Sequence, residues 1–195
     1  MKNEFFALMS RMRFITRWGL MRNTFPENIQ EHSHQVAVLA HALALIRREI
    51  LKLDGPDPDR CAVAALYHDA SEILTGDLPT PIKYYNSEIR NAYKSVERVA
   101  GNRLLTMLPP QLRDCYEHLV LEDEPGVTPI VKAADKLSAH IKCLEEQKAG
   151  NTEFDSAARQ TMDALVELHM PELDWFLVNC LPAYTLDLDQ LRLDD

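Results

Sequence analysis

Hydrophobic residues recur at helical spacing along most of the chain. In the segment after Asn28 they follow steps of three and four residues, at Val36, Leu39, Leu43, Ile46 and Ile50. In the segment after Thr128 the same steps connect Ile130, Ala134, Leu137, Ile141 and Leu144. Because this spacing gives a helix one continuous apolar face, the pattern predicts two long core helices.

Helix start signals precede most of the periodic segments. They are Asn28 with Glu31, Asp57 before Pro58, Thr128 before Pro129, and Thr152 three residues before Asp155. The pattern predicts helices over Phe5–Met9, Pro58–Thr75, Glu88–Leu108, Pro110–Leu121, Glu153–His169 and Glu172–Cys180. No segment shows a convincing strand alternation, so we expect an all-α fold: a compact helical bundle with residues 1–195 forming one domain.

A break in the pattern follows the predicted helix Pro58–Thr75. Gly76 is a suitable helix stop, and Pro79 and Pro81 come shortly after it. Because proline lacks a backbone N–H and fixes its φ angle, this segment is expected to be a rigid loop.

Composition narrows the possible functions. Of 195 residues, 46% are hydrophobic and 26% are charged, as in ordinary globular proteins, and the net charge is -9. A protein that coats a nucleic-acid polymer needs clustered basic residues, so we expect no such partner. The four cysteines form no C-x-x-C pair, which predicts reduced thiols.

The apolar segments are short. The longest run, Val36–Ile46, falls well below the roughly 20 residues that cross a bilayer, and the apolar stretch Phe5–Met9 is followed at once by arginines. We therefore expect no membrane partner and a cytoplasmic protein.

Four residues combine the side chains that bind transition metals. They are His32, the doublet His68 and Asp69, and the distant Asp135. Imidazole and carboxylate ligands hold a divalent ion while leaving positions open for water and substrate, which suits metal-assisted hydrolysis. The sequence thus predicts one metal site.

His32, Asp69 and Asp135 are each expected to face the interior, with His68 adjacent to Asp69. His32 lies one helical turn before Val36, and Asp69 has Leu66 three residues before it and Ile73 four after it. A buried carboxylate needs a cation or hydrogen-bond donors, and a shared ion would satisfy all of them. The alternative is ordinary: a lone inward histidine is more often a hydrogen-bonded core residue, and the aspartates could pair with Arg or Lys.

With the order His, His-Asp, Asp on a helical chain, this sequence resembles the HD-domain metal-dependent phosphohydrolases. Within that superfamily its local strings are most similar to those of the bacterial 5'-deoxynucleotidases. The strings that carry the resemblance are 17–23, 27–33, 67–72, 74–81, 132–135 and 142–146. The resemblance is strong in the first half of the chain and weakens after Leu181 and Pro182. Two-metal relatives place two more histidines before the last aspartate, where this chain has only His118, so one metal ion is favoured.

The resemblance implies a substrate and a set of ligands. The substrate is a deoxyribonucleoside 5'-monophosphate, cleaved to deoxynucleoside and phosphate by a homodimer. The metal ion, cobalt or manganese in this family, is held by His32, His68, Asp69 and Asp135. The residues implied in substrate binding are Arg17, Trp18, His32, Asp69, Asp77, Leu78, Pro79 and Thr80.

Catalytic roles follow from side-chain chemistry. Glu72 lies four residues after His68 on the predicted helix, near the metal ligands, so it is expected to be the general base. Arg17 offers a planar fork of donors for phosphate, and a protonated Asp77 could assist the leaving 5'-oxygen. The ring of Trp18 beside C2' would exclude a ribose hydroxyl. The alternatives are that Arg17 is a surface arginine, that Trp18 is an ordinary core residue, and that the loop after Gly76 is only a structural turn.

Other functions fit the same ligands. An HD phosphohydrolase could act on nucleoside triphosphates, guanosine tetraphosphate or a cyclic dinucleotide, although only Arg17, Arg22 and Lys83 supply positive charge close to the motifs. A non-catalytic nucleotide-binding helical module is another possibility, and a plain helical bundle without a bound metal is a third.

Overall fold

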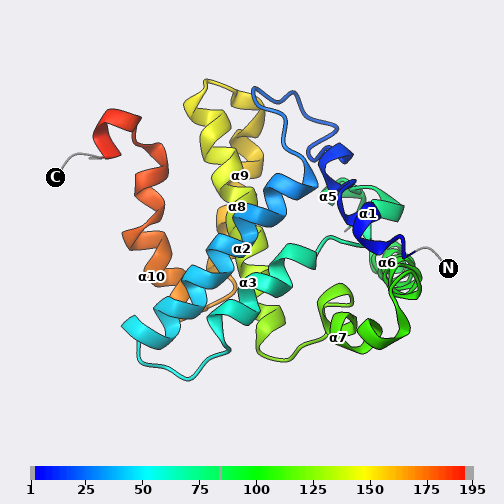
Figure 1. Cartoon of the computed structure of the whole chain (residues 1–195). Coiled ribbons are helices and arrows are strands. Elements are labelled where there is room, and N and C mark those ends of the chain that lie inside the picture. Colours follow the sequence, from blue (N-terminus) through cyan, green and yellow to red (C-terminus); the bar gives the residue numbers. More distant parts are fainter. Residues whose placement is uncertain (1–2, 84, 192–195) are drawn as a thin grey trace.

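The computed structural model describes residues 3–83 and 85–191, and its regular elements are helices (Figure 1). The α-helices are α1 Phe5–Met9, α2 Ile29–Leu45, α3 Pro58–Tyr67, α4 Glu72–Thr75, α5 Thr80–Lys83, α6 Ser87–Thr106, α7 Pro110–Val120, α8 Val127–Lys148, α9 Asp155–Val166 and α10 Pro171–Asn179. Short helical turns, η1 to η5, lie at Met12–Phe14, Ile46–Ile50, Thr152–Phe154, Leu181–Thr185 and Leu188–Leu191. Within the described ranges the extended structure is one isolated bridge between Thr16 and Asn28, so the predicted all-α class is confirmed.

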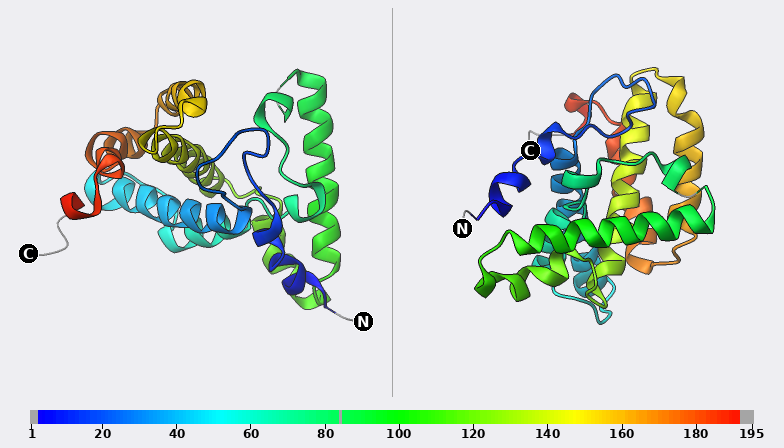
Figure 2. Two further views of the ribbon diagram at one scale, coloured as in Figure 1. Left: turned by 90° about the horizontal axis from the view of Figure 1, so that it is seen from above. Right: turned by 90° about the vertical axis from the view of Figure 1, so that its right-hand side faces the viewer.

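The core lies where α2, α3 and α8 pack together, with α10 on their outer side (Figures 1 and 2). The positions predicted from α2 and α8 are at its centre: Val36, Leu39, Leu43, Ala134, Leu137 and Ile141 are 0–2% exposed. The long helix α6 lies across the other end of the bundle, against α4, α5 and α7 (Figure 2).

The first core helix begins as the sequence predicts. The Asn28 side chain accepts hydrogen bonds from the backbone N–H groups of Gln30 and Glu31, at 3.0 and 3.1 Å, so it caps α2. The far end differs from the prediction, because the chain leaves α-helical geometry at Ile46 and Ile50 is 48% exposed.

The predicted continuous helix Pro58–Thr75 is wrong. Helix α3 ends at Tyr67, and α4 covers only Glu72–Thr75. Between them the Tyr67 carbonyl accepts from the N–H of Ala70 at 2.9 Å, and the Asp69 carbonyl accepts from the N–H of Glu72 at 3.0 Å, so the chain makes tight turns here. Asp69 thus points inward from a turn between two helices.

Two smaller predictions are also corrected. Thr128 does not cap the second core helix: α8 starts at Val127 after Gly126, and the Thr128 hydroxyl donates to the Glu122 carbonyl at 3.0 Å. The rigid loop after Gly76 is shorter than expected, because α5 begins at Thr80, and Pro81 fits its first turn, where an N–H has no helical partner.

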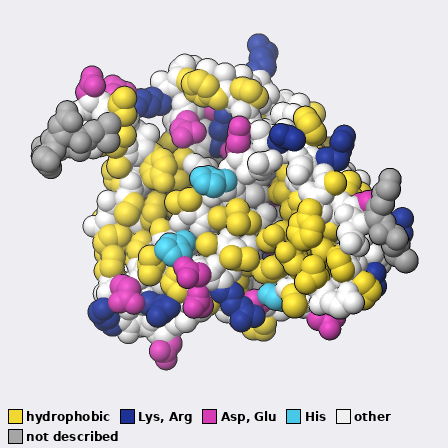
Figure 3. Space-filling model, viewed as in Figure 1, with side chains coloured by type: hydrophobic (Ala, Val, Ile, Leu, Met, Phe, Trp, Pro, Cys, Tyr) yellow, Lys and Arg dark blue, Asp and Glu magenta, His cyan; other side chains and the backbone are white. Residues whose placement is uncertain are grey.

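Helix length and hydropathy show whether a helix could cross a membrane. In the described part of the chain, no helix is both long and apolar enough to cross a membrane. On the face drawn in Figure 3, lysine and arginine side chains are scattered among acidic and hydrophobic ones and form no single basic patch.

Candidate metal centre and active site

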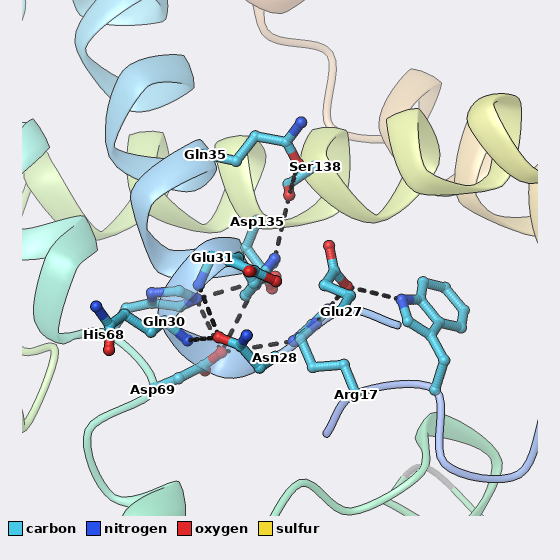
Figure 4. Close-up of polar contacts among 12 residues, drawn as sticks. Arg17, Glu27, Asn28, Gln30, Glu31, Gln35, His68, Asp69, Asp135 and Ser138 are labelled. Atoms are coloured by element: carbon cyan, nitrogen blue, oxygen red, sulfur yellow. Dashed lines mark hydrogen bonds and ion pairs between the residues drawn. The ribbon is translucent and has the colours of Figure 1, made fainter. Parts of the chain in front are cut away.

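Three elements bring the predicted metal ligands together. His32 comes from the first turns of α2. His68 and Asp69 come from the turn after α3, and Asp135 comes from α8 (Figure 4). His32, His68 and Asp135 each offer one possible metal-ligand atom, and these three atoms lie within 4.8 Å of one another. A single ion can bridge this spacing. Asp69 completes the group, with its Oδ2 at 3.2 Å from His68 Nε2 and 3.6 Å from His32 Nε2.

Outer hydrogen bonds fix both imidazole rings. His68 Nδ1 donates to the Ala65 carbonyl at 2.7 Å. His32 Nδ1 lies 3.1 Å from Ser138 Oγ, and the Ser138 hydroxyl donates to Gln35 Oε1 at 2.6 Å, so Nδ1 is the donor toward Ser138. Each ring therefore has its Nε2 free for a metal ion, as metal-binding histidines do.

Those nitrogens face carboxylate oxygens. His32 Nε2 lies 3.0 Å from Asp135 Oδ1, while His68 Nε2 and Asp69 Oδ2 are buried without a hydrogen-bond partner in the described part of the chain. Lone pairs that face carboxylates repel unless a proton or a cation lies between them. The donor set and its orphaned atoms thus fit a divalent metal ion.

The electrostatics agree with this fit. Burial acts to lower the pKa of His68, but Asp69 and Asp135 outweigh it and raise that pKa to about 10. Burial acts to raise the pKa of Asp135, but His32 and His68 lower it to about 2. The site therefore has a strong affinity for positive charge.

Arg17 lies at the edge of the same group. Its Nη1 is 3.5 Å from Asp69 Oδ2 and its Nε is 3.0 Å from Glu27 Oε2 (Figure 4). Burial acts to lower the pKa of Arg17, but the surrounding carboxylates, Asp69 first, raise it above its ordinary value. The guanidinium is thus a permanent, largely buried cation beside the candidate metal ligands rather than a surface arginine.

Trp18 sits next to it in an uncommon backbone conformation. Its φ of 58° is left-handed, its indole N–H donates to Glu27 Oε2 at 2.9 Å, and its ring contacts Phe154 at a centroid distance of 5.3 Å. The ring is only partly buried, so one side packs on the protein while the rest stays accessible.

Two acidic residues follow the metal doublet. Glu72, at the start of α4, is 4% exposed and its Oε2 has no hydrogen-bond partner among the described residues. Burial raises the pKa of Glu72 to about 9, and the charges of Asp69 and Asp77 add to this. Burial also raises the pKa of Asp77, against the opposing charge of Arg17. Leu78 and Pro79 follow in the loop and are half-buried, and the Thr80 side chain lies outside the described part.

A buried carboxylate on α8 fixes the segment that leads to α2. Glu146 is fully buried and accepts hydrogen bonds from the backbone N–H groups of Thr24 and Phe25, from Asn151 and from Lys142. These bonds hold the chain just before Glu27, which in turn contacts Arg17 and Trp18.

Several of these residues carry no signal in the sequence. Glu27, Gln35, Ser138 and Glu146 come near the site only through tertiary contacts between segments about 100 residues apart or across a loop. Glu27 and Glu146 stand inside strings that carry the family resemblance, whereas Gln35 and Ser138 do not.

The fold is that of the HD-domain phosphohydrolases. The structure is similar to an HD-domain phosphohydrolase from Listeria innocua, with a TM-score of 0.78 and 22% identity over 97% of this chain and 92% of that one. It is also similar to a cyanophage S-2L HD phosphohydrolase that binds dA and one catalytic Zn²⁺, with a TM-score of 0.64 and 22% identity over 90% of this chain and 95% of that one.

Sequence comparison identifies the particular family. The model of the YfbR-like 5'-deoxynucleotidases matches residues 4–184. Proteins named 5'-deoxynucleotidase from Cronobacter sakazakii and Erwinia tasmaniensis are 46% and 47% identical, over 99% and 97% of this chain and 98% and 96% of theirs. The chain belongs to the YfbR-like 5'-deoxynucleotidase family, which confirms the resemblance and the prediction of a hydrolytic enzyme of this class.

Proposed function

We propose that this site hydrolyses deoxyribonucleoside 5'-monophosphates to deoxynucleoside and inorganic phosphate. The observation that carries the proposal is the pair of fixed imidazoles whose bare Nε2 atoms face two carboxylates, with the buried Arg17 guanidinium beside them. Family membership supplies the substrate class, because the relatives with 46–47% identity are named 5'-deoxynucleotidases.

We propose one divalent metal ion, held by His32, His68, Asp69 and Asp135. Cobalt or manganese is the proposed identity, and zinc is the alternative because the phage protein of similar fold binds one Zn²⁺. When bound, the ion would supply Lewis-acid polarisation of the phosphate and activation of water. We propose that His32 and Asp69 also contact the bound substrate.

Arg17 is proposed to bind the phosphate. Its Nε is occupied by Glu27 and its Nη1 lies 3.5 Å from Asp69 Oδ2, so Nη2 and the second N–H of Nη1 would contact phosphate oxygens. Because the side chain is only 12% exposed, this contact would form where water screens it weakly.

Glu72 is proposed as the general base. A water molecule would attack phosphorus and form a new P–O bond, and Glu72 would take the proton that this water loses. The raised pKa of Glu72 gives its carboxylate a high proton affinity, and the positive charges of Lys83, Arg17 and a bound cation favour the ionised form that can accept the proton.

Asp77 is proposed to protonate the leaving oxygen. The bond between phosphorus and the 5'-oxygen breaks in the same reaction, and the oxygen needs a proton to leave as a hydroxyl. Burial raises the pKa of Asp77, which favours the protonated carboxyl group that can donate it.

The sugar is proposed to lie against Trp18, with Leu78, Pro79 and Thr80 along the nucleotide. The partly accessible indole ring would leave room for a hydrogen but not for a hydroxyl group at C2', which would select deoxyribose.

We also propose that residues 1–195 act as one domain, that the enzyme is a cytoplasmic homodimer, and that it has no membrane or nucleic-acid polymer as partner.

The test is a phosphate-release panel with cobalt, manganese and zinc. It compares deoxyribonucleoside and ribonucleoside monophosphates with a nucleoside triphosphate, guanosine tetraphosphate and a cyclic dinucleotide. We expect release from deoxyribonucleoside monophosphates first, and Glu72→Gln should lower kcat by about 10²- to 10⁴-fold. Glu88→Gln, an exposed residue in the first turn of α6, is the matched control.

Three results would contradict the proposal. Preferred cleavage of the triphosphate, the tetraphosphate or the cyclic dinucleotide would assign the site to a different phosphohydrolase. Binding of metal and deoxynucleotide without phosphate release would make the chain a binding module. An active Glu72→Gln enzyme would place the base elsewhere.

A further inference from the structure

One carboxylate oxygen joins the two residues proposed to bind substrate. Glu27 Oε2 accepts from Arg17 Nε at 3.0 Å and from the Trp18 indole N–H at 2.9 Å (Figure 4). The Glu27 backbone carbonyl also accepts from the Arg17 N–H at 2.9 Å. Glu27 thus holds Arg17 through both its main chain and its side chain.

The ion pair between Arg17 and Glu27 is shielded from solvent. The two side chains are 12% and 13% exposed, so water screens their attraction far less than it screens a surface pair. With Nε bound to Glu27 and Nη1 at 3.5 Å from Asp69 Oδ2, the plane of the guanidinium is fixed between the two carboxylates. The carboxylate of Glu27 therefore sets the direction in which the remaining donors of Arg17 point.

Trp18 needs an anchor because its backbone is strained. A φ of 58° is unfavourable for a bulky L-residue, and such a conformation persists only where surrounding contacts fix it. The contact with Phe154 fixes the position of the indole ring, and the hydrogen bond to Glu27 fixes its rotation.

Glu27 is also tied to the metal-binding helix. It directly precedes Asn28, the cap of α2, and His32 lies in that same helix. The bridge between Thr16 and Asn28, with the N–H of Ile29 donating to the Ile15 carbonyl at 3.0 Å, holds the two segments side by side. Movement of Glu27 would therefore shift Arg17 and Trp18 relative to the metal ligands.

We infer that Glu27 is a positioning residue that holds the phosphate-binding Arg17 and the sugar-contacting Trp18 in one register with the metal ligands. The inference rests on the proposed function of that site. Since Arg17 and Trp18 share one acceptor, loss of the carboxylate would disturb binding of the phosphate and of the deoxyribose together.

The kinetic test is Glu27→Gln, which keeps the side-chain size and removes the charge. We expect kcat/KM for dAMP to fall by about 10- to 100-fold, the usual effect of losing a residue that orients a ligand-binding side chain. The preference for dAMP over AMP should also shrink by about tenfold, since the hydrogen bond of Trp18 to a neutral amide is weaker than its bond to a carboxylate. Glu27→Asp keeps the charge but is one methylene shorter, so it should give an intermediate loss.

Glu31→Gln is the matched control, because it removes an exposed carboxylate of α2 one turn from Glu27 and should leave the preference unchanged. A double-mutant cycle with Trp18→Phe, which removes the indole N–H, should show effects on the preference that do not add. If Glu27→Gln lowers kcat/KM for dAMP and AMP by the same factor, or if the two effects add, Glu27 has only a structural role and the inference is wrong.

A spectroscopic test needs no turnover. In a Trp175→Phe background Trp18 is the only tryptophan, since the chain has two. Glu27→Gln should then shift the emission maximum of the metal-loaded enzyme before substrate is added, because the indole N–H exchanges a charged carboxylate acceptor for a neutral amide. An unchanged spectrum would overturn the inference. If the wild-type enzyme releases no phosphate from any monophosphate, the proposed function fails while this test of Glu27 still stands.

Discussion

The hydrogen-bond relay behind His32 gives a sharp prediction about metal affinity. Ser138 is fully buried, and its hydroxyl accepts from His32 Nδ1 at 3.1 Å while donating to Gln35 Oε1 at 2.6 Å. The relay keeps the proton of the ring on Nδ1 and leaves Nε2 free for a metal. Ser138→Ala removes the acceptor of His32 Nδ1 together with the donor to Gln35.

The expected size of the effect follows from these contacts. Without Ser138 the ring proton of metal-free His32 can move to Nε2, which lies 3.0 Å from Asp135 Oδ1. Metal binding at Nε2 then forces the proton back to a buried Nδ1 without an acceptor, and an unsatisfied buried donor costs about 1–3 kcal/mol. Since about 1.4 kcal/mol corresponds to a factor of ten, metal affinity should fall by roughly 10- to 100-fold, the range typical of lost outer-shell partners.

The assay is competition for zinc against a chromogenic chelator. Ser33→Ala is the matched control: Ser33 is a buried serine next to His32, and its hydroxyl has no hydrogen-bond partner in the described part of the chain. Ser33→Ala should bind zinc as the wild-type protein does. Equal affinities for Ser138→Ala and Ser33→Ala would refute the relay.

Three further predictions concern stability and reactivity. Burial acts to raise the pKa of Glu146, but its hydrogen bonds outweigh burial and lower the pKa from 4.5 to about 2. Denaturation should therefore show that Glu146→Gln is less stable than the wild type by about 3 kcal/mol at pH 7. This difference in stability should vanish as the pH falls from 4.5 toward 2. Gly76 has a φ of 72° and ψ of 164°, a region that only glycine tolerates, so thermal unfolding should show Gly76→Ala losing about 1–3 kcal/mol while Gly19→Ala, in open space, loses far less. Thiol labelling at pH 8 should modify exposed Cys115 quickly and Cys61 slowly, because burial raises the pKa of Cys61 to about 11; equal rates would contradict this.

Local signals in the sequence predict the helices that build the core. The cap at Asn28 and the apolar spacing in α2 and α8 depend on residues close together in the chain, and the structure has both features. The same reasoning failed for Pro58–Thr75, because periodicity cannot detect a turn made by residues that individually suit a helix. Leu66, used as a marker of the buried face, is 42% exposed.

The candidate site, too, is only partly predictable from the sequence. The types of the metal ligands were visible in the sequence, because histidine and aspartate are unusual on an apolar face. Their supporting contacts were not, since Ser138 meets His32 across 106 positions of the chain. The inward direction of Asp69 was predicted for an incorrect reason: a turn, not a helical face, turns it toward His68.

The interruptions of helical order explain how a small bundle forms this site. A continuous helix from Pro58 would place His68 and Asp69 about 100° apart around its axis, on different faces. The turn after Tyr67 brings His68 Nε2 and Asp69 Oδ2 to 3.2 Å, and it starts α4 so that Glu72 is buried nearby. The second interruption, the segment before α2, places Arg17 against the same carboxylate. Regular helices supply the rigid frame, and the breaks between them bring acid, base and cation-binding groups together.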